Sequence, residues 1–347
     1  MKASCKLFMV IAALIVSSSA IAADNFKVCW SHYTGWEPWQ YAQDSGILKK
    51  WADKNGIKID LTLVNDYIES VNLYTTGQFD ACTMTNMDAL TIPAAGGVDS
   101  TALIIGDYSN GNDGIVVRGG KTIADLKGRD ILMVELSVSH YMLARALSMN
   151  GLSERDVRIL NASDADIAAA FAVQTKAAVV TWNPPLQQVR QQKGATLVFD
   201  SSKIPGEILD LMVVKTNADP RLKKALVGAW YETMKAMSAG GQTQRNAIAA
   251  MAKSAGGTEA EFNAQLLTTK MFFTPADAVN IAVDPQLVKT MDAVRKFSFE
   301  KGLFGTNAKN VDMIGIEFPN AKVLGDPKNI KLRFDISVTE QARDGKL

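Results

Sequence analysis

The chain has 347 residues, of which 47% are hydrophobic and 21% are charged, so it can bury the cores of two domains of ordinary size. This composition excludes a disordered or fibrous protein. The 37 Lys and Arg residues against 36 Asp and Glu residues argue against the strongly basic surface of a nucleic-acid-binding protein.

The first 23 residues predict a cleaved signal peptide. Lys2 and Lys6 precede an apolar run over residues 7–16, and Ala20-Ile21-Ala22 is a small-x-small cleavage pattern. The run is shorter than the roughly 20 residues that span a bilayer, which disfavours the alternative of an uncleaved anchor. We therefore expect a near-neutral mature protein, beginning at Ala23 or Asp24 and exported to the periplasm.

From residue 26 onward, short apolar runs alternate with longer helical patterns. This rhythm predicts a mostly parallel sheet covered by helices, an α/β fold. The first group of strands is expected at 26–31, 58–64, 79–85 and 100–108, with helices at 37–54, 66–76 and 86–95. A second group of strands is expected at 114–118, 129–134, 157–162, 176–182, 195–200 and 209–215, with helices at 138–150, 164–174 and 183–192.

The restart of this pattern predicts two lobes. After residue 219 the chain is mostly helical up to about residue 300, and we expect this part to pack back on the first lobe. Lobe 1 would then comprise 24–110 and 213–347, and lobe 2 would comprise 111–212. The chain would cross near 108–114 and 204–212, which forms a hinge with a ligand cleft between the lobes. The role of residues 300–347 is left open.

Two cysteines remain after the signal peptide, and both lie within strand-like apolar runs. Cys29 and Cys82 are interpreted either as small buried hydrophobic residues or as a disulfide, which the sequence does not decide. With only two histidines in the chain, no metal-binding spacing is present, and no metal or cofactor is predicted.

Ligands of α/β proteins bind beyond the carboxyl ends of strands, so the loops at these ends hold the candidate site residues. Each also has a structural interpretation, as a core ring, a helix cap or a turn residue. The loops also contain Glu37 and Glu207. The candidate ligand-binding residues are Tyr33, Trp36, Trp39, Asn86, Asp88, Asp113, Glu135, Ser137, His140, Trp182 and Asp210.

Taken together, these loops contain several carboxylates and aromatic rings but no Lys or Arg. Burying an anion among them would be unfavourable, whereas a cation could pair with a carboxylate and lie against aromatic faces. The sequence therefore predicts a small cationic ligand or one rich in hydrogen-bond donors.

At these loops the chain resembles the nitrate/sulfonate/taurine class of ABC solute-binding proteins. The similar segments are the aromatic turn after the first strand and residues 77–81, 112–115, 137–141 and 180–184. The resemblance covers about residues 24–300. It implies a type II-like periplasmic binding fold, no catalysis, a monomer, and a membrane permease and an ATPase as partners.

Within this class, the sequence is most similar to the subgroup encoded beside urea carboxylase-type enzymes. That subgroup implies guanidine or a urea-like compound as the ligand, and guanidinium agrees with the acidic, aromatic loops. The alternatives are a sulfonate, a nitrate or a pyrimidine.

Other functions on the same fold are pyrimidine synthase of thiamine biosynthesis, aromatic desulfinase and periplasmic sensor subunit. The synthases carry a cysteine-rich segment that is missing here, and neither Cys29 nor Cys82 has a predicted basic neighbour to activate it. We therefore expect a binding protein rather than an enzyme.

Overall fold

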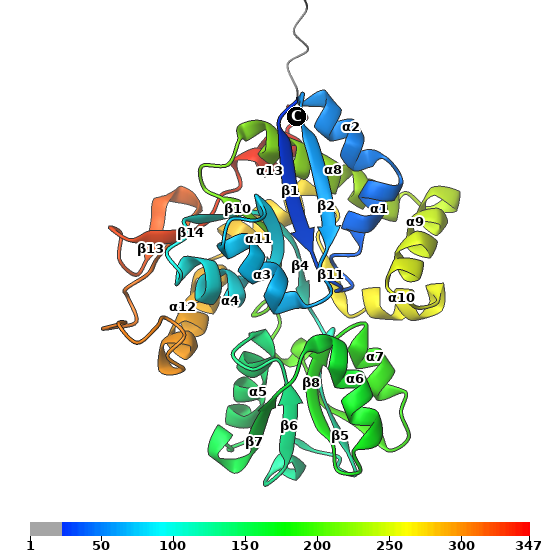
Figure 1. Ribbon diagram of the computed structural model, residues 1–347, viewed down its shortest axis with the longest axis vertical. Helices are drawn as coiled ribbons and strands as arrows, with labels where there is room; N and C mark the ends of the chain where they lie inside the picture. Colours follow the sequence, from blue (N-terminus) through cyan, green and yellow to red (C-terminus); the bar gives the residue numbers. More distant parts are fainter. Residues whose placement is uncertain (1–22) are drawn as a thin grey trace, which may run out of the picture.

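A computed structural model describes residues 23–347, and the predicted signal peptide lies outside this range. The chain folds into two lobes, each built around one β-sheet (Figure 1). The larger, lobe 1, carries both ends of the described chain, and lobe 2 contains only a middle segment. The predicted fold class, two α/β lobes, is confirmed. Among residues 23–347, no helix combines the length and the apolar character needed to cross a bilayer.

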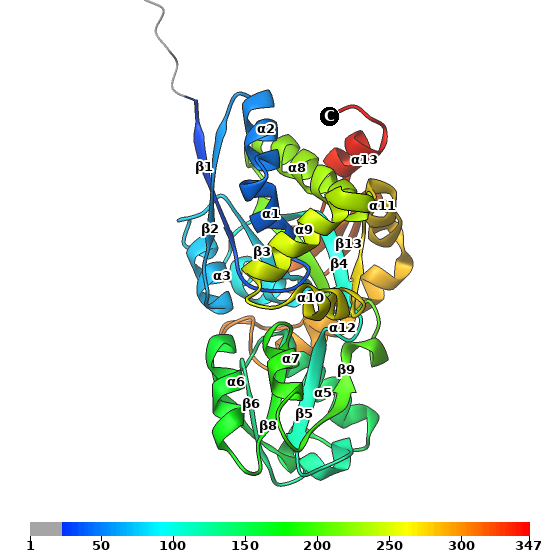
Figure 2. The same cartoon turned by 90° about the vertical axis from the view of Figure 1, so that its right-hand side faces the viewer.

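Lobe 1 contains a nine-stranded mixed sheet with the order β13-β12-β14-β4-β10-β3-β1-β2, and β11 pairs with β4 beside this path. Helices pack around it (Figure 2). Its strands are β1 (Asn25–Trp30), β2 (Lys58–Leu63), β3 (Ala81–Thr85), β4 (Ser100–Ser109), β10 (Leu209–Lys215), β11 (Thr269–Met271), β12 (Gly315–Phe318), β13 (Lys322–Leu324) and β14 (Ile330–Phe334). Its helices are α1 (Pro38–Asp44), α2 (Ile47–Lys54), α3 (Tyr67–Thr75), α4 (Asn86–Ala89), η1 (Leu90–Ala94), α8 (Pro220–Ser238), α9 (Gly241–Ser254), α10 (Glu259–Leu266), α11 (Pro275–Val283), α12 (Pro285–Glu300), η5 (Pro319–Ala321) and α13 (Ser337–Arg343).

Lobe 2 contains a five-stranded sheet with the order β7-β6-β8-β5-β9. Its strands are β5 (Asp113–Arg118), β6 (Asp130–Met133), β7 (Arg158–Asn161), β8 (Ala178–Trp182) and β9 (Ala195–Asp200). Its helices are η2 (Ile123–Leu126), α5 (Val138–Met149), η3 (Glu154–Asp156), α6 (Asp164–Val173), α7 (Pro185–Arg190) and η4 (Ser201–Lys203).

The chain passes between the lobes at two places. The first follows β4 and ends where β5 begins, and the second leads from η4 to β10. Because β10 pairs with β3 and β4, residues 209–212 belong to lobe 1 rather than to lobe 2 as predicted. The two strands that leave the crossings, β5 and β10, run antiparallel to their neighbours, so both sheets are mixed rather than mostly parallel.

Two predicted helices are each interrupted. The helix expected over 37–54 is divided into α1 and α2 by Gly46, whose φ of 79° lies in the left-handed region. The helix expected over 86–95 continues from α4 into a wider π-helical turn, η1. Pro93 lies inside this turn and has no backbone N–H to donate, so a regular α-helix loses a hydrogen bond there.

The C-terminal segment, whose role the sequence left open, extends the sheet of lobe 1. Strand β14 pairs in parallel with β4, and β12 pairs with β14. Helix α12 lies at the junction of the lobes (Figure 2). This segment therefore supports the strand that leads to the first crossing.

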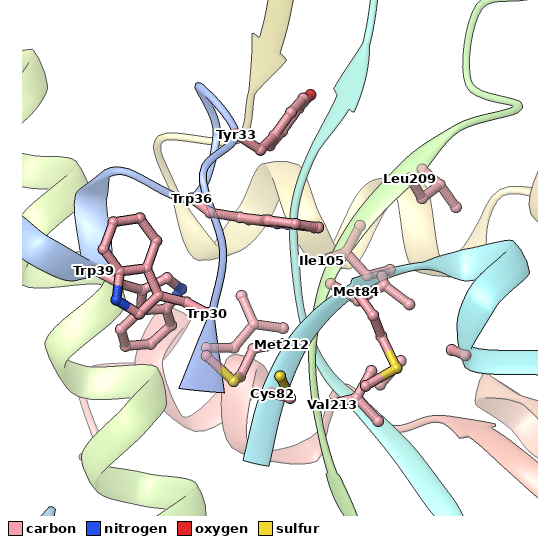
Figure 3. Close-up of a cluster of buried hydrophobic side chains, with 14 of the residues drawn as sticks. Trp30, Tyr33, Trp36, Trp39, Cys82, Met84, Ile105, Leu209, Met212 and Val213 are labelled. Carbon is pink, nitrogen blue, oxygen red and sulfur yellow. The ribbon is translucent and has the colours of Figure 1, made fainter. Parts of the chain in front are cut away.

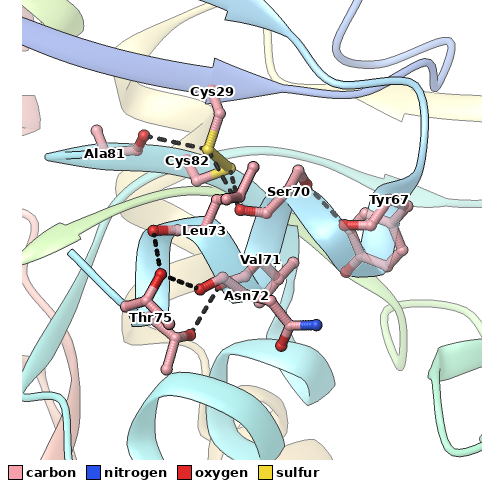
Figure 4. Close-up of a disulfide and its surroundings, with 10 residues drawn as sticks. Cys29, Tyr67, Ser70, Val71, Asn72, Leu73, Thr75, Ala81 and Cys82 are labelled. Carbon is pink, nitrogen blue, oxygen red and sulfur yellow. Dashed lines mark hydrogen bonds between the residues drawn. A yellow bond between two sulfur atoms is a disulfide. The ribbon is translucent and has the colours of Figure 1, made fainter. Parts of the chain in front are cut away.

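Cys29 and Cys82 face each other on the adjacent strands β1 and β3 and form a disulfide (Figure 4). Both residues are fully buried. The bond joins positions that are 53 residues apart, and closing a loop of that length restricts the unfolded chain.

The protein should be more stable with this disulfide than without it. We expect a Cys29→Ala/Cys82→Ala variant to lose about 2–4 kcal/mol of unfolding free energy, measured by chemical denaturation. The intact mass of the unreduced protein should be two hydrogens below that of the reduced protein. Equal unfolding midpoints with and without reductant would contradict this prediction.

Candidate functional site

A small cavity of about 10 Å³, room for about one water molecule, lies between the lobes. The strands β3 and β8 end at it, and β5 and β10 begin at it, so both sheets direct residues into the same space. This volume is far below the roughly 300–1,000 Å³ of sites for drug-sized ligands, so a ligand larger than a water molecule requires the lobes or the lining side chains to move apart. The lining residues are Tyr33, Trp36, Tyr67, Thr85, Asp113, Val138, Trp182, Ile208 and Asp210.

Aromatic rings from both lobes form much of the wall. The Trp36 ring centroid lies 5.1 Å from that of Tyr33 and 5.5 Å from that of Tyr67. Trp182 of lobe 2 meets the Tyr67 ring edge-on at 5.7 Å, and its Nε1–H donates a hydrogen bond to the backbone oxygen of His32 at 3.3 Å. Closing the lobes therefore completes the aromatic wall.

Three buried carboxyl groups lie at or beside the cavity. Asp113 and Asp210 line it, and Asp107 is opposite Asp210 in the β4–β10 pairing. Burial raises the pKa of Asp113 to about 7 and that of Asp107 to about 7. Burial and the charges of Asp107 and Asp113 raise the pKa of Asp210 well above its usual range.

No compensating cation lines this cavity. None of the lining residues, within the described part of the chain, is Lys, Arg or His. The Oδ2 atoms of Asp107 and Asp210 have no hydrogen-bond partner among residues 23–347. The arrangement therefore provides acceptor oxygens and negative charge for a ligand that carries positive charge and N–H groups.

Asp88 lies behind the cavity wall rather than in it. Its Oδ2 accepts hydrogen bonds from Tyr67 Oη at 2.6 Å and from Thr85 Oγ1 at 2.8 Å. Burial raises the pKa of Asp88 to about 6, although these two hydrogen bonds and the backbone N–H of Val138 act to lower it. Asp88 therefore positions two lining side chains, and the prediction that it lines the cavity is corrected.

Trp39 and Asn86 are also outside the cavity. The Trp39 ring packs against Trp230 at 5.2 Å, and Figure 3 shows it beside Trp30, away from the Trp36 ring. Trp39 follows Trp36 by three residues at the start of α1, and the helix turns it into the core of lobe 1. The Asn86 side chain donates to the Glu207 backbone oxygen and accepts from the Leu209 N–H, so it fixes the second crossing.

Glu135, Ser137 and His140 do not reach the cavity either. The left-handed φ of 65° at Leu136 turns the chain sharply before α5, and the Glu135 side chain is exposed in a separate groove. Ser137 caps α5 by accepting from the Ser139 N–H. His140 donates from Nε2 to Glu154 at 2.5 Å and accepts from the Leu136 N–H. Burial and the nearby Lys301 lower the pKa of His140 to about 4, so the ring is neutral.

Two other carboxylates near the cleft are paired. Glu207 accepts hydrogen bonds from Arg145 at 2.9 Å and from Tyr141 at 2.5 Å. Glu37 lies 2.7 Å from Nδ1 of His32. Burial alone would lower the pKa of His32, but the hydrogen bond and charge of Glu37 outweigh it and raise the pKa. Asp107, Asp113 and Asp210, which line or border the cavity, have no basic partner among residues 23–347, and Asp88 lies behind them.

Direct contacts hold the lobes together around the cavity. Phe297 of α12 packs edge-on against Tyr141 of lobe 2 at 5.3 Å. Lys301 forms an ion pair with Glu154. On another side, Gln265 Nε2 donates to Gln187 Oε1 at 2.6 Å. These contacts all cross from lobe 1 to lobe 2, so they fix the position of one lobe against the other.

The sequence analysis missed Tyr67, Thr85 and Asp107 as site residues. Asp107 had a recognisable signal, because it is a charged residue near the end of an otherwise apolar, buried strand. Tyr67 follows the helix cap Asp66 directly after β2, which is also a strand-end position. Thr85 caps α4 by accepting from the Asp88 N–H, and a capping role alone accounts for a threonine at that position.

A family model described as NMT1/THI5 like matches residues 46–236, which is more than half of the chain. The chain belongs to this family. Over 84 residues it is 33% identical to the putative aliphatic sulfonates-binding protein of Escherichia coli K12. This alignment covers 24% of the chain and 26% of that protein, so the chain matches about a quarter of the length of this curated relative.

Solved structures share the fold of this NMT1/THI5-like chain. The alkanesulfonate-binding protein SsuA of Xanthomonas axonopodis pv. citri, bound to MOPS, superposes with a TM-score of 0.66 at 18% identity, over 82% of this chain and 96% of that one. The desulfurization enzyme DszB superposes with a TM-score of 0.54 at 16% identity, over 80% of this chain and 93% of that one. The fold therefore occurs in both binding proteins and an enzyme.

The buried carboxyl groups should make the ligand-free protein less stable as the pH rises. A carboxyl group whose pKa is raised by folding binds more protons when folded, so stability falls from the unfolded pKa near 4 up to the folded value of about 7. We expect the melting temperature to fall between pH 5 and pH 7.5, and Asp113→Asn to reduce that fall. The same profile in both proteins would contradict the assignment.

Proposed function

We propose that this protein is the periplasmic solute-binding component of an ABC importer and that its ligand is guanidinium. In this proposal the lobes close on the ligand, and the closed form docks on a membrane permease driven by an ATPase. The protein acts as an exported monomer and performs no chemistry on its ligand. The observation that carries the proposal is the small interlobe cavity with two buried carboxyl groups and no basic lining residue.

The charge and the N–H groups of guanidinium match the acceptor groups that line the cavity. It is a planar cation with N–H donors around its edge, and Asp113 and Asp210 provide acceptors on two sides, from lobe 2 and lobe 1. The Trp36, Tyr67 and Trp182 rings offer aromatic surfaces, and each cation–π contact is worth about 0.5–2 kcal/mol. Binding requires both lobes, so the ligand shifts the equilibrium to the closed form.

Neutral urea has the same planar shape as guanidinium but should bind this cavity less tightly. Its carbonyl oxygen needs a hydrogen-bond donor, which the Nε1–H of Trp36, without a partner among residues 23–347, can supply, so charge rather than hydrogen bonding separates the two ligands. Its lack of charge forfeits the attraction to the ionised carboxylates. Urea is therefore expected to bind more weakly than guanidinium.

A sulfonate is the second candidate, and the names of the relatives favour it. The start of α5 at Val138 is also part of the lining, and helix N-termini attract anions. Against it stand Asp113 and Asp210, which would face a sulfonate without a Lys or Arg to compensate. Each carboxyl would have to be protonated before an anion entered.

A desulfinase-like enzyme finds less support. Such an enzyme needs a cysteine thiolate in its cleft, and the two cysteines of the described chain are joined in a buried disulfide between β1 and β3. Neither lines the cavity.

A thermal-shift screen of the mature protein, followed by calorimetry, tests the ligand. The panel is guanidinium at non-denaturing concentration, methylguanidine, agmatine, urea, taurine, nitrate and a pyrimidine. We expect guanidinium to give the largest shift, about 2.7 kcal/mol of added stability at 100 Kd. A shift with taurine or nitrate and none with guanidinium would refute the guanidinium assignment.

The acidic site is tested by Asp210→Asn, which keeps the shape and removes one charge. Losing a buried charge partner costs about 2 kcal/mol or more, so guanidinium affinity should fall by about 30-fold or more by calorimetry. Glu135→Gln is the matched control, because Glu135 is an exposed carboxylate near the cleft and outside the cavity. Equal losses in the two variants would argue against Asp210 as a ligand contact.

The pH dependence separates the two candidate ligands. Guanidinium needs ionised carboxylates, so its affinity should rise from pH 6 to pH 8, through the pKa of about 7 at Asp113. A sulfonate needs protonated carboxyls, and its affinity should fall over the same range. Calorimetric titrations with guanidinium and taurine at three pH values decide between them.

A further inference from the structure

Asp107 and Asp210 form a buried acid pair that has no evident role in stabilising the fold. They are opposite each other where β4 and β10 pair, at an irregularity in the ladder. Asp107 is 0% exposed and Asp210 is 3% exposed. Each has one carboxyl oxygen without a hydrogen-bond partner among residues 23–347.

The surroundings of the pair contain acids and a phenol. Tyr33, in the loop after β1, donates a hydrogen bond from Oη to Asp107 Oδ1 at 2.9 Å. Asp113, at the start of β5, raises the pKa of both carboxyl groups by its charge. Gly35 lies against the Asp107 carboxyl group. A Cβ atom built on Gly35 would be 2.2 Å from Asp107 Oδ2, so there is no room for a side chain at this position. Strand β11, which also pairs with β4, places Met271 opposite Asp107.

Two adjacent carboxylates without a cation cannot both ionise readily, because each charge disfavours the other. The pair therefore titrates as a unit, with its proton shared between the two residues. Only Asp210 of the two lines the cavity, while Asp107 lies beside it and bonds Tyr33. When Asp107 gains or loses a proton, the charge on Asp210 changes, and Asp210 is the member of the pair that lines the cavity.

We propose that Asp107 and Asp210 hold one proton between them in the empty site and release it to solvent when a cationic ligand binds against Asp210 and Asp113. This inference rests on the proposed function of the cavity. One positive charge enters as another leaves, so the net charge of the buried pair and its ligand is unchanged. Asp107 is then a specificity-determining positioning residue, which makes the site exchange a proton for a cation.

The exchange also explains how the cavity can select for charge. A neutral molecule of the same shape supplies no charge to replace the proton, so the pair stays protonated and Asp210 offers less negative charge. A cation displaces the proton and gains the full attraction of both ionised carboxylates. Because a proton is exchanged for the cation, the affinity for the ligand depends on pH.

Calorimetry of the mature protein with guanidinium chloride measures the proton directly. Titrations at pH 7 in phosphate, HEPES and Tris, whose ionisation enthalpies differ, give the number of protons released per ligand bound. We expect Asp107→Asn to release about one proton fewer than the wild type, and the rise in log affinity per pH unit to be smaller by about the same number. Glu259→Gln removes one exposed carboxyl and should change neither quantity.

Tyr33→Phe gives a second, independent variant. It removes the hydrogen bond that favours ionised Asp107, so the pair should hold its proton more tightly. The pH range over which affinity rises should move upward, whereas Asp107→Asn should make the rise itself smaller. Equal proton release in the wild type and Asp107→Asn, or no upward movement in Tyr33→Phe, would overturn the shared proton.

A ligand-free titration separates failure of this inference from failure of the proposed function. Proton uptake of the empty wild-type protein between pH 5 and pH 9 should exceed that of Asp107→Asn by one group. If this difference is found but guanidinium does not bind, the acid pair stands and the assigned ligand is wrong. If guanidinium binds and the difference is missing, the ligand stands and the acid pair is refuted.

Discussion

Burial of carboxyl groups without a partner cation is the constraint on which the site depends. Desolvation makes an ionised Asp113 or Asp210 unfavourable, and no basic residue in the lining offsets it. The raised pKa values of Asp113 and Asp210 result from this desolvation cost. Such a site is stabilised either by protons or by a ligand that carries positive charge, and the choice between them links occupancy to pH.

The two crossings between the lobes bring these groups together. Asp113 begins β5 and Asp210 is near the beginning of β10, so each is fixed by a strand that starts at the hinge. Asp107 is near the end of β4, and Trp182 ends β8. Rigid strands hold the charged groups, while the ring wall is closed only when lobe 2 brings Trp182 against Tyr67. The geometry thus couples the position of the lobes to the completeness of the site.

Two other acidic groups near the cavity are paired with basic residues. Glu207 is neutralised by Arg145 and Glu37 faces His32, so these carboxylates support the hinge and the aromatic loop rather than the ligand. The interlobe contacts of Lys301 with Glu154 and of Phe297 with Tyr141 lie outside the cavity. The contacts that hold the lobes together are therefore separate from the lining of the cavity.

The sequence by itself determined the strands from β1 to β10, the restart of the pattern at lobe 2 and the acidic, aromatic character of the strand-end loops, because all three depend on local periodicity and composition. It did not predict the later strands β11 to β14. It could not decide which loop side chains meet. Trp36 and Trp39 are three residues apart, yet one lines the cavity and the other packs in the core, because Trp36 lies in the turn before α1 and Trp39 lies within the helix. Glu135 is turned outward by the backbone at Leu136, and Arg145 reaches Glu207 across 62 residues. The pairing of Asp107 with Asp210 arises only from the register of β4 with β10, a long-range contact that no local pattern records.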